Sequence, residues 1–170
     1  MTGVPHKLRP YLPADAHALR DLYAQSIEEL TQDAYDEDQR LAWIERAEDE
    51  AAFARRLGSG LTLVVGAPGD YKGFATLKDG THLDMLFVHP HAARQGVGTA
   101  IVDALERIAA SRGAKAITAD ASDTALAFFD ARGYTPVRRN TVALGDAWLS
   151  NTTMSKQLAP LAPTTPQTAS

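Results

Sequence analysis

A short segment in the middle of the chain combines the residue types that hold a polyanion. Residues 83–88 are apolar apart from Asp84, Pro90 ends this run, and Gly96 and Gly98 precede an amphipathic helical pattern. Glycine lacks a Cβ, so a ligand can approach the backbone closely, and the amides that open a helix point outward at its positive dipole end. Phosphate or pyrophosphate is the natural ligand of such a junction. A glycine pair before a helix can also serve only as a packing or turn device, and the residues alone leave both interpretations open.

The dinucleotide-binding (Rossmann) fingerprint is a second nucleotide motif that contains paired glycines. It requires a third Gly or Ala at a fixed spacing, an N-terminal strand and helix, and an acidic residue about 20 positions further on. Ile101 occupies the third position, and the motif lies in the middle of the chain. The sequence therefore disfavours this fingerprint.

Two polar residues in the same apolar strand could exchange protons. His82 and Asp84 lie two positions apart, which predicts that they share one face of the strand with Leu86 and Val88. Burial beside a cleft should raise the pKa of Asp84 toward the range of a general base, and histidine already exchanges protons near neutral pH. We predict a direct or water-mediated base role for both. The structural alternative is an Asp bonded to backbone or to a neighbouring Arg, and a His at an exposed strand end.

The elements that must position these residues follow from hydrophobic periodicity and turn residues. Helices are predicted from Asp15, from within 36–38, over about 48–57, over 99–112, and after a cap at Ser122 or Asp123. Strands are predicted over about 6–12, 61–65, 71–78, 81–88, 116–120, 134–142 and 148–158. Tight turns make the middle strands an antiparallel meander, whereas a helical crossover implies one parallel pair. The pattern therefore predicts a single-domain α/β protein with a mixed sheet.

The composition is that of an ordinary globular protein. The chain has 170 residues, 45% of them hydrophobic and 22% charged, which suits one domain. Its formal net charge of -4 argues against general nucleic-acid binding. The lack of cysteine excludes disulfides and thiolate chemistry. The sequence shows no apolar leader and no run of 18 apolar residues, so we expect a cytoplasmic protein with no membrane partner.

Two smaller features lie at the C-terminus and around Pro90. Residues 159–170 are rich in Pro, Thr, Ala and Ser, and we expect them to form a flexible tail. His89 and His91 flank Pro90, but two histidines without a third ligand make a poor metal site, so we predict no metal.

The segment around the glycine pair resembles the acyl-CoA signature of the GNAT superfamily, the general-control-related N-acetyltransferases. In that signature a strand ending in L-x-V-x-P leads into Q/R-x-x-G-x-G/A, and here Leu86-Phe87-Val88-His89-Pro90 is followed by the glycine pair. Ala93 replaces the usual Gln or Arg, and Arg94 and Gln95 are its nearest replacements. The resemblance extends over residues 7–158. It implies a GNAT-like domain over 1–158, with a mostly antiparallel mixed sheet of about seven strands flanked by helices, and acetyl-CoA as the acyl donor.

The resemblance also assigns roles to individual residues. Backbone amides near Leu86, Phe87 and Val88 would bond the pantetheine and polarise the thioester carbonyl, as an oxyanion hole does. The implied acetyl-CoA site further includes Arg94, Gln95, Gly96, Val97, Gly98, Thr99, Ser122 and Phe129. Phe129 stands where the family pattern N-x-x-A-x-x-F-Y-x-x-x-G-F has a tyrosine that protonates the leaving thiolate, and Ser122 replaces the asparagine. The thiolate must then take its proton from water or another group.

The acceptor site should lie against the region between the first strand and the meander. Tyr35 and Trp43 could stack on an acceptor there, and the acidic residues 36–38 could attract an amine. Alternatively, the acidic residues serve the helix dipole and Trp43 belongs to the core.

The sequence thus favours an N-acetyltransferase that moves an acetyl group from acetyl-CoA to a primary amine of a small molecule or peptide, by direct attack in a ternary complex. We allow for a homodimer. The alternative is a non-catalytic acyl-CoA-binding or regulatory module, because Ala93 and Phe129 depart from the family pattern. A toxin that acetylates aminoacyl-tRNA is disfavoured by the acidic charge balance.

Overall fold

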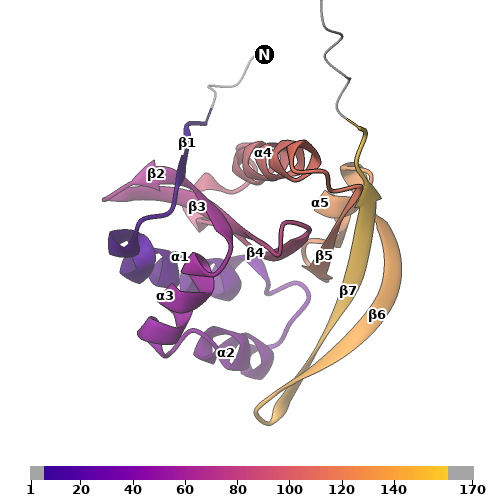
Figure 1. Ribbon diagram of the computed structural model, residues 1–170. Helices are drawn as coiled ribbons and strands as arrows, with labels where there is room; N and C mark the ends of the chain where they lie inside the picture. The colour runs from indigo at the N-terminus through magenta and orange to yellow at the C-terminus, as the bar shows by residue number, and fades with distance from the viewer. Residues whose placement is uncertain (1–5, 161–170) are drawn as a thin grey trace, which may run out of the picture.

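The computed structural model describes residues 6–160 and is built around a seven-stranded sheet in the order β1-β2-β3-β4-β5-β7-β6 (Figure 1). The strands are β1 (Leu8–Pro10), β2 (Leu61–Ala67), β3 (Asp70–Lys78), β4 (His82–Val88), β5 (Ala116–Ser122), β6 (Thr135–Leu144) and β7 (Ala147–Gln157). Only the β4–β5 pair is parallel within this sheet. The predicted mixed, mostly antiparallel sheet is confirmed. The predicted tail 159–170 lies outside the described residues except for its first two.

Helices cover both faces of the sheet (Figure 1). They are α1 (Ala16–Leu30), α2 (Glu37–Glu45), α3 (Glu50–Gly58), α4 (Val97–Ser111) and α5 (Leu126–Ala131), with short 3-10 turns at Pro13–Asp15 and Pro90–Ala92. One apolar core joins the sheet to α1 and α3, and the other joins it to α4 and α5. Among the described residues no helix is long and apolar enough to cross a membrane.

The helix α4 approaches the sheet closely because of its own apolar spacing and a glycine in the opposing strand. Ile101, Val102 and Leu105 recur at helical intervals and are fully buried. A Cβ on Gly73 of β3 would come within 2.7 Å of Val97 Cγ1, at the first turn of α4. Glycine at this position therefore lets the start of α4 settle over the middle of the sheet.

A β-bulge in β4 decides which side chains face which helices. Thr76 pairs with Met85 and Leu77 with Leu83, so Asp84 has no partner on β3. Met85 and Phe87 consequently pack with α1 and α3, whereas Leu83, Leu86 and Val88 pack with α4. The prediction that His82 and Asp84 share a face with Leu86 and Val88 is therefore wrong. Strict alternation breaks at the bulge, and both polar residues lie on the α1–α3 side.

The strands β4 and β5 separate after a very short parallel pairing. Only His82–Thr118 and Leu83–Ala119 are in register, while β5 pairs with β7 over its whole length. The edge of β4 from Met85 onward therefore faces a gap rather than a neighbouring strand. This gap is the V-shaped opening in which the candidate site lies.

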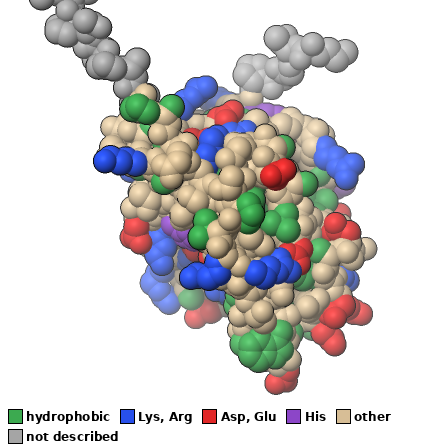
Figure 2. Space-filling view, turned by 90° about the vertical axis from the view of Figure 1, so that its right-hand side faces the viewer, with side chains coloured by type: hydrophobic (Ala, Val, Ile, Leu, Met, Phe, Trp, Pro, Cys, Tyr) green, Lys and Arg blue, Asp and Glu red, His purple; other side chains and the backbone are tan. Residues whose placement is uncertain are grey.

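The β6–β7 hairpin forms the far edge of the sheet. Figure 2 views the molecule from this side and shows hydrophobic side chains scattered among charged ones. Val137 and Trp148 are exposed large apolar residues of the two strands. From the sequence we allowed for a homodimer, and that homodimer stays a prediction.

Candidate active site

A cavity of about 1000 Å³ occupies the V between β4 and β5. It runs from the loop before α4, past the facing edges of the two strands, to the wall made by α1, α2 and the turn between them. Sequence positions far apart in the chain thus line one continuous space. Its volume and its lining by residues from several elements suit a ligand with a polyanionic end and a reactive end.

The glycine loop opens α4 with amides that make no hydrogen bond within the helix. Gly96 adopts a left-handed conformation (φ 81°) and is the N-cap of α4 without a side-chain cap. The first helical hydrogen bond joins the Ala100 amide to the Gly96 carbonyl at 3.0 Å. The amides of Val97, Gly98 and Thr99 therefore have no acceptor within the helix, and all three residues line the cavity. This geometry is a ready anion site.

The neighbouring loop residues contribute unequally to the cavity. Arg94 also has a positive φ of 61° and lines the cavity beside Gly96. The side chain of Gln95 instead turns back, and its Nε2 donates to the His91 carbonyl at 3.0 Å. Of the two replacements considered for the usual Gln or Arg, only Arg94 lies at the cavity.

Two backbone amides of β4 point into the V. The His89 amide donates to the Lys72 carbonyl of β3 at 2.8 Å. Successive amides of a strand alternate between its edges, so Phe87 also donates toward β3, whereas Leu86 and Val88 point toward the β5 side. Since β5 has already separated there, these two amides can serve a ligand. The ring of Phe87 packs in the α1–α3 core.

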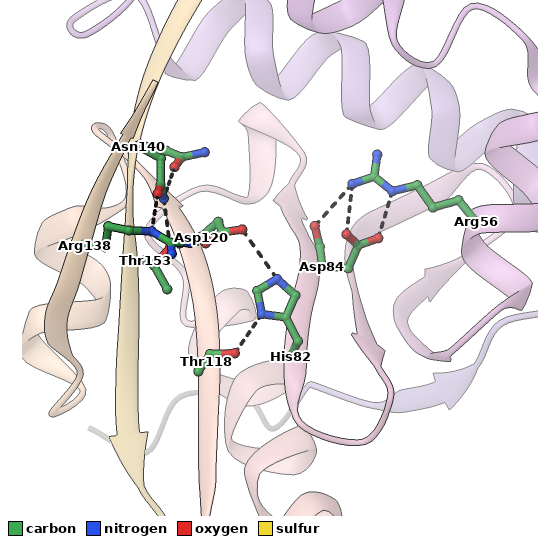
Figure 3. A network of polar contacts seen from close by, with 9 residues as sticks. Arg56, His82, Asp84, Thr118, Asp120, Arg138, Asn140 and Thr153 are labelled. Atoms are coloured by element: carbon green, nitrogen blue, oxygen red, sulfur yellow. Dashed lines mark hydrogen bonds and ion pairs between the residues drawn. The ribbon is translucent and has the colours of Figure 1, made fainter. Parts of the chain in front are cut away.

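Asp84 is held in a two-point ion pair with α3 (Figure 3). Arg56 Nε donates to Asp84 Oδ2 at 2.8 Å and Nη2 donates to Oδ1 at 3.2 Å. Burial alone would raise the pKa of Asp84, but the hydrogen bonds and charge of Arg56 outweigh it, so the pKa is lowered. The expectation of a raised pKa is therefore wrong, and Asp84 is a paired, ionised carboxylate. No local feature of the sequence pointed to Arg56, because it lies on a different element.

His82 belongs to a separate network that faces β5 (Figure 3). Its Nδ1 lies 2.7 Å from Thr118 Oγ1, and its Nε2 lies 3.6 Å from Asp120 Oδ2. The two predicted base residues thus share a face but have different partners. Asp120 was missed, although Thr118 and Asp120 alternate with apolar residues in the predicted strand 116–120 in the same way as His82 and Asp84 do in β4.

The residues around α5 form an apolar side of the cavity. Phe129 is only 3% exposed and packs between Phe128 and Tyr134, with ring centroids 5.2 and 5.0 Å away. Tyr134 is buried behind it, and its hydroxyl donates to Glu106 at 3.3 Å. Ser122 Oγ accepts the Ala125 amide at 3.2 Å and so caps the turn before α5. Both Ser122 and Phe129 line the cavity.

The predicted acceptor wall also lines the cavity. Tyr35 is buried, and its hydroxyl donates to the Ser150 carbonyl at 2.7 Å and accepts the Asp123 amide at 2.9 Å. Trp43 packs edge-on against Tyr35 at 5.6 Å between centroids. Asp36 caps α2 by accepting the Gln39 amide at 2.9 Å. The acidic residues 36–38 therefore serve the start of a helix and do not line the cavity.

Comparison with known proteins gives the family. The family model "Acetyltransferase (GNAT) domain" matches residues 31–158. An uncharacterized N-acetyltransferase, YafP, of Escherichia coli (strain K12) is 28% identical over 145 residues, which cover 85% of this chain and 91% of that protein. The chain therefore belongs to the GNAT acetyltransferase family. It is an acetyl-CoA-dependent N-acetyltransferase, which decides against the alternative of a non-catalytic module.

Solved structures agree with this assignment. A crystal structure of a GCN5-related N-acetyltransferase, also described as an aminotransferase of class II, from Rhodopseudomonas palustris is 49% identical, with a TM-score of 0.90. The match covers 93% of this chain and 99% of that one. The structure of YncA from Salmonella typhimurium with its cofactor acetyl-CoA is 24% identical, covers 94% and 97% of the two chains, and has a TM-score of 0.59. The predicted GNAT-like fold is confirmed.

Proposed function

We propose that this enzyme acetylates a primary amine of a small molecule or peptide, by direct attack of the amine on acetyl-CoA in a ternary complex. The observation that carries the proposal is the single cavity that joins the free amides of α4 to the polar pair on β4. The donor and the acceptor can occupy opposite ends of this cavity and meet between the facing edges of β4 and β5. The lack of cysteine also removes the most familiar residue for a covalent acyl-enzyme.

The donor end suits the parts of acetyl-CoA in order. The amides of Val97, Gly98 and Thr99 would bind the pyrophosphate, with Arg94 adding positive charge. The amides of Leu86 and Val88 would bond the pantetheine and the thioester carbonyl, and the rings of α5 would pack along the arm. A carbonyl held by fixed backbone donors is polarised for attack, because these donors need no reorganisation.

The acceptor end supplies the base. His82 faces the V with both ring nitrogens near polar groups, and Asp84 stays ionised beside Arg56. We assign the first proton of the acceptor ammonium to His82, directly or through water, and treat Asp84 as the partner that fixes Arg56 in the cavity wall. Tyr35 and Trp43 would contact the body of the acceptor.

The proton balance does not require a tyrosine at position 129. The attacking nitrogen forms the C–N bond as the C–S bond breaks, and it still carries one proton more than the amide product. The thiolate can take up this second proton through water, so that coenzyme A leaves as the thiol. Phe129 then keeps only a packing role.

Thiol release tests the proposal directly. Acetyl-CoA is mixed with the enzyme and a panel of primary amines and short peptides, and the acetylated nitrogen is identified by mass spectrometry. Initial rates measured with both substrates varied should give intersecting lines in a double-reciprocal plot, as a ternary complex requires. Parallel lines together with an acetylated enzyme would contradict direct attack, and no thiol release with any amine would contradict the acceptor class.

A further inference from the structure

Asp120 is the one carboxylate at the narrow end of the V that no Lys or Arg of the described chain pairs with. It comes one position after the last β4–β5 pair, as Asp84 does on the opposite strand. Both lie on the face of the sheet turned toward α1–α3 and both line the cavity. Arg56 neutralises Asp84, whereas the polar partners of Asp120 are His82 and a hydroxyl. The negative charge at this point is therefore available to a ligand.

A chain of hydrogen bonds holds this carboxylate from behind (Figure 3). Arg138 Nε donates to Asn140 Oδ1 at 2.8 Å, and Asn140 Nδ2 donates to Thr153 Oγ1 at 2.8 Å. The Thr153 hydroxyl then donates to Asp120 Oδ1 at 2.6 Å. All three donors point the same way, from β6 through β7 to β5. They fix one oxygen of Asp120 and leave Oδ2 on the side of His82.

The gap between Oδ2 and His82 Nε2 is the important distance. It measures 3.6 Å, too long for a direct hydrogen bond. When His82 Nδ1–H donates to Thr118, Nε2 presents its lone pair to the carboxylate, and two acceptors face each other. A donor with several protons and a positive charge satisfies both at once. An ammonium group is such a donor.

We propose that Asp120 binds the ammonium group of the acceptor and holds it against His82 Nε2. This inference rests on the proposed acetylation of a primary amine and adds the residue that recognises the charge. The ammonium donates a hydrogen bond to Asp120 Oδ2, which stays ionised, and transfers one proton to His82 Nε2. The neutral nitrogen then attacks the thioester carbonyl, and its next surplus proton follows the departing thiolate. Acceptors that are neutral at the reacting position are correspondingly disfavoured.

Direct binding separates this inference from turnover. Calorimetry on the enzyme saturated with coenzyme A measures the affinity of aliphatic and arylalkyl primary amines and of their hydroxyl counterparts. We expect Asp120→Asn to weaken amine binding by about tenfold or more, the usual worth of one charged hydrogen bond, and to leave the binding of the alcohols unchanged. Asp146→Asn, at the exposed β6–β7 turn, removes the same charge elsewhere and should change neither.

Several results would overturn the inference. The first is an unchanged amine affinity in Asp120→Asn. The second is an equal loss of affinity for amines and for alcohols, and the third is that no amine binds to the wild type. As a control, a coenzyme A affinity and a thermal unfolding midpoint equal to those of the wild type show that Asp120→Asn is folded. If amines bind through Asp120 but no thiol is released, the proposed acetylation fails while the recognition of the ammonium group by Asp120 stands. Asp120→Glu keeps the charge and should recover part of the amine affinity.

Discussion

Acid should destabilise this protein partly through Asp15, which anchors the start of α1. Asp15 is 3% exposed, and its carboxylate accepts two hydrogen bonds from Arg9 at 2.8 Å, one from the Tyr71 hydroxyl at 2.6 Å and one from the Leu12 amide at 2.8 Å. The hydrogen bonds from Arg9 lower its pKa from 3.8 to about 2, against the opposing effect of burial. The charged form is therefore the stabilising one.

The size and direction of the effect follow from linkage. The lowered pKa corresponds to about 2 kcal/mol of unfolding free energy. This contribution is complete above the unfolded-state pKa of about 4 and is lost as pH falls toward about 2, with roughly half gone near pH 3. We expect Asp15→Asn to be less stable than the wild type at pH 7 by at least this amount. The difference in unfolding free energy between the two proteins should stay constant down to about pH 5 and narrow below it.

Urea unfolding of both proteins at several pH values between 7 and 3 measures this gap. Asp146→Asn, which removes an exposed carboxylate of the β6–β7 turn, is the matched control and should follow the wild type at every pH. A difference between Asp15→Asn and the wild type that stays constant from pH 7 to pH 3 would refute the reasoning, because the ion pair would then contribute nothing that depends on ionisation.

Three further predictions concern the active site. Gly98→Asp should weaken coenzyme A binding at least about tenfold, measured by calorimetry. Gly58→Asp is the control, because a side chain there meets open space, and it should bind coenzyme A like the wild type. Equal coenzyme A affinities of the two variants would contradict the anion site. His82→Gln should lower kcat by on the order of 100-fold, and Asp84→Asn should cost less and leave the acidic limb of the pH profile in place; the reverse order would make Asp84 the base. Phe129→Tyr should leave turnover unchanged, and a large gain would mean that thiolate protonation limits the rate.

The sequence allowed much of the fold to be predicted because local rules govern these elements. The helix expected over 99–112 spans Val97–Ser111, and the strand expected over 116–120 spans Ala116–Ser122. The edge position of the first strand followed from Pro10, which lacks an amide hydrogen. Periodicity and turn residues carry such information over a few neighbouring positions, so element types and approximate bounds were accessible.

The missed features all depend on contacts between distant segments. The bulge at Asp84 is defined by its register with β3, and the residues of β4 alone fit regular alternation. Arg56 reaches Asp84 from a helix that precedes it by 28 positions. The roles of Asp120 and Tyr35 likewise arise from strand order and loop placement. Partners of this kind are set by the assembled sheet, and a single sequence does not encode them in any local pattern.

The bulge in β4 shifts the alternation of side chains by one residue, so that the two halves of the strand present different residues to each face of the sheet. Downstream of it, Leu86 and Val88 keep their side chains in the α4 layer while their amides face the V. If strict alternation continued upstream, His82 and Asp84 would fall on the α4 side, in an apolar layer where neither could meet an acceptor. One extra residue of backbone turns them to the other face. The placement of acid–base groups here thus depends on strand register as much as on side-chain identity. Deleting residue 84 would remove the bulge and the partner of Arg56, but it would leave Met85, Leu83 and His82 in regular alternation, with His82 still on the α1–α3 side.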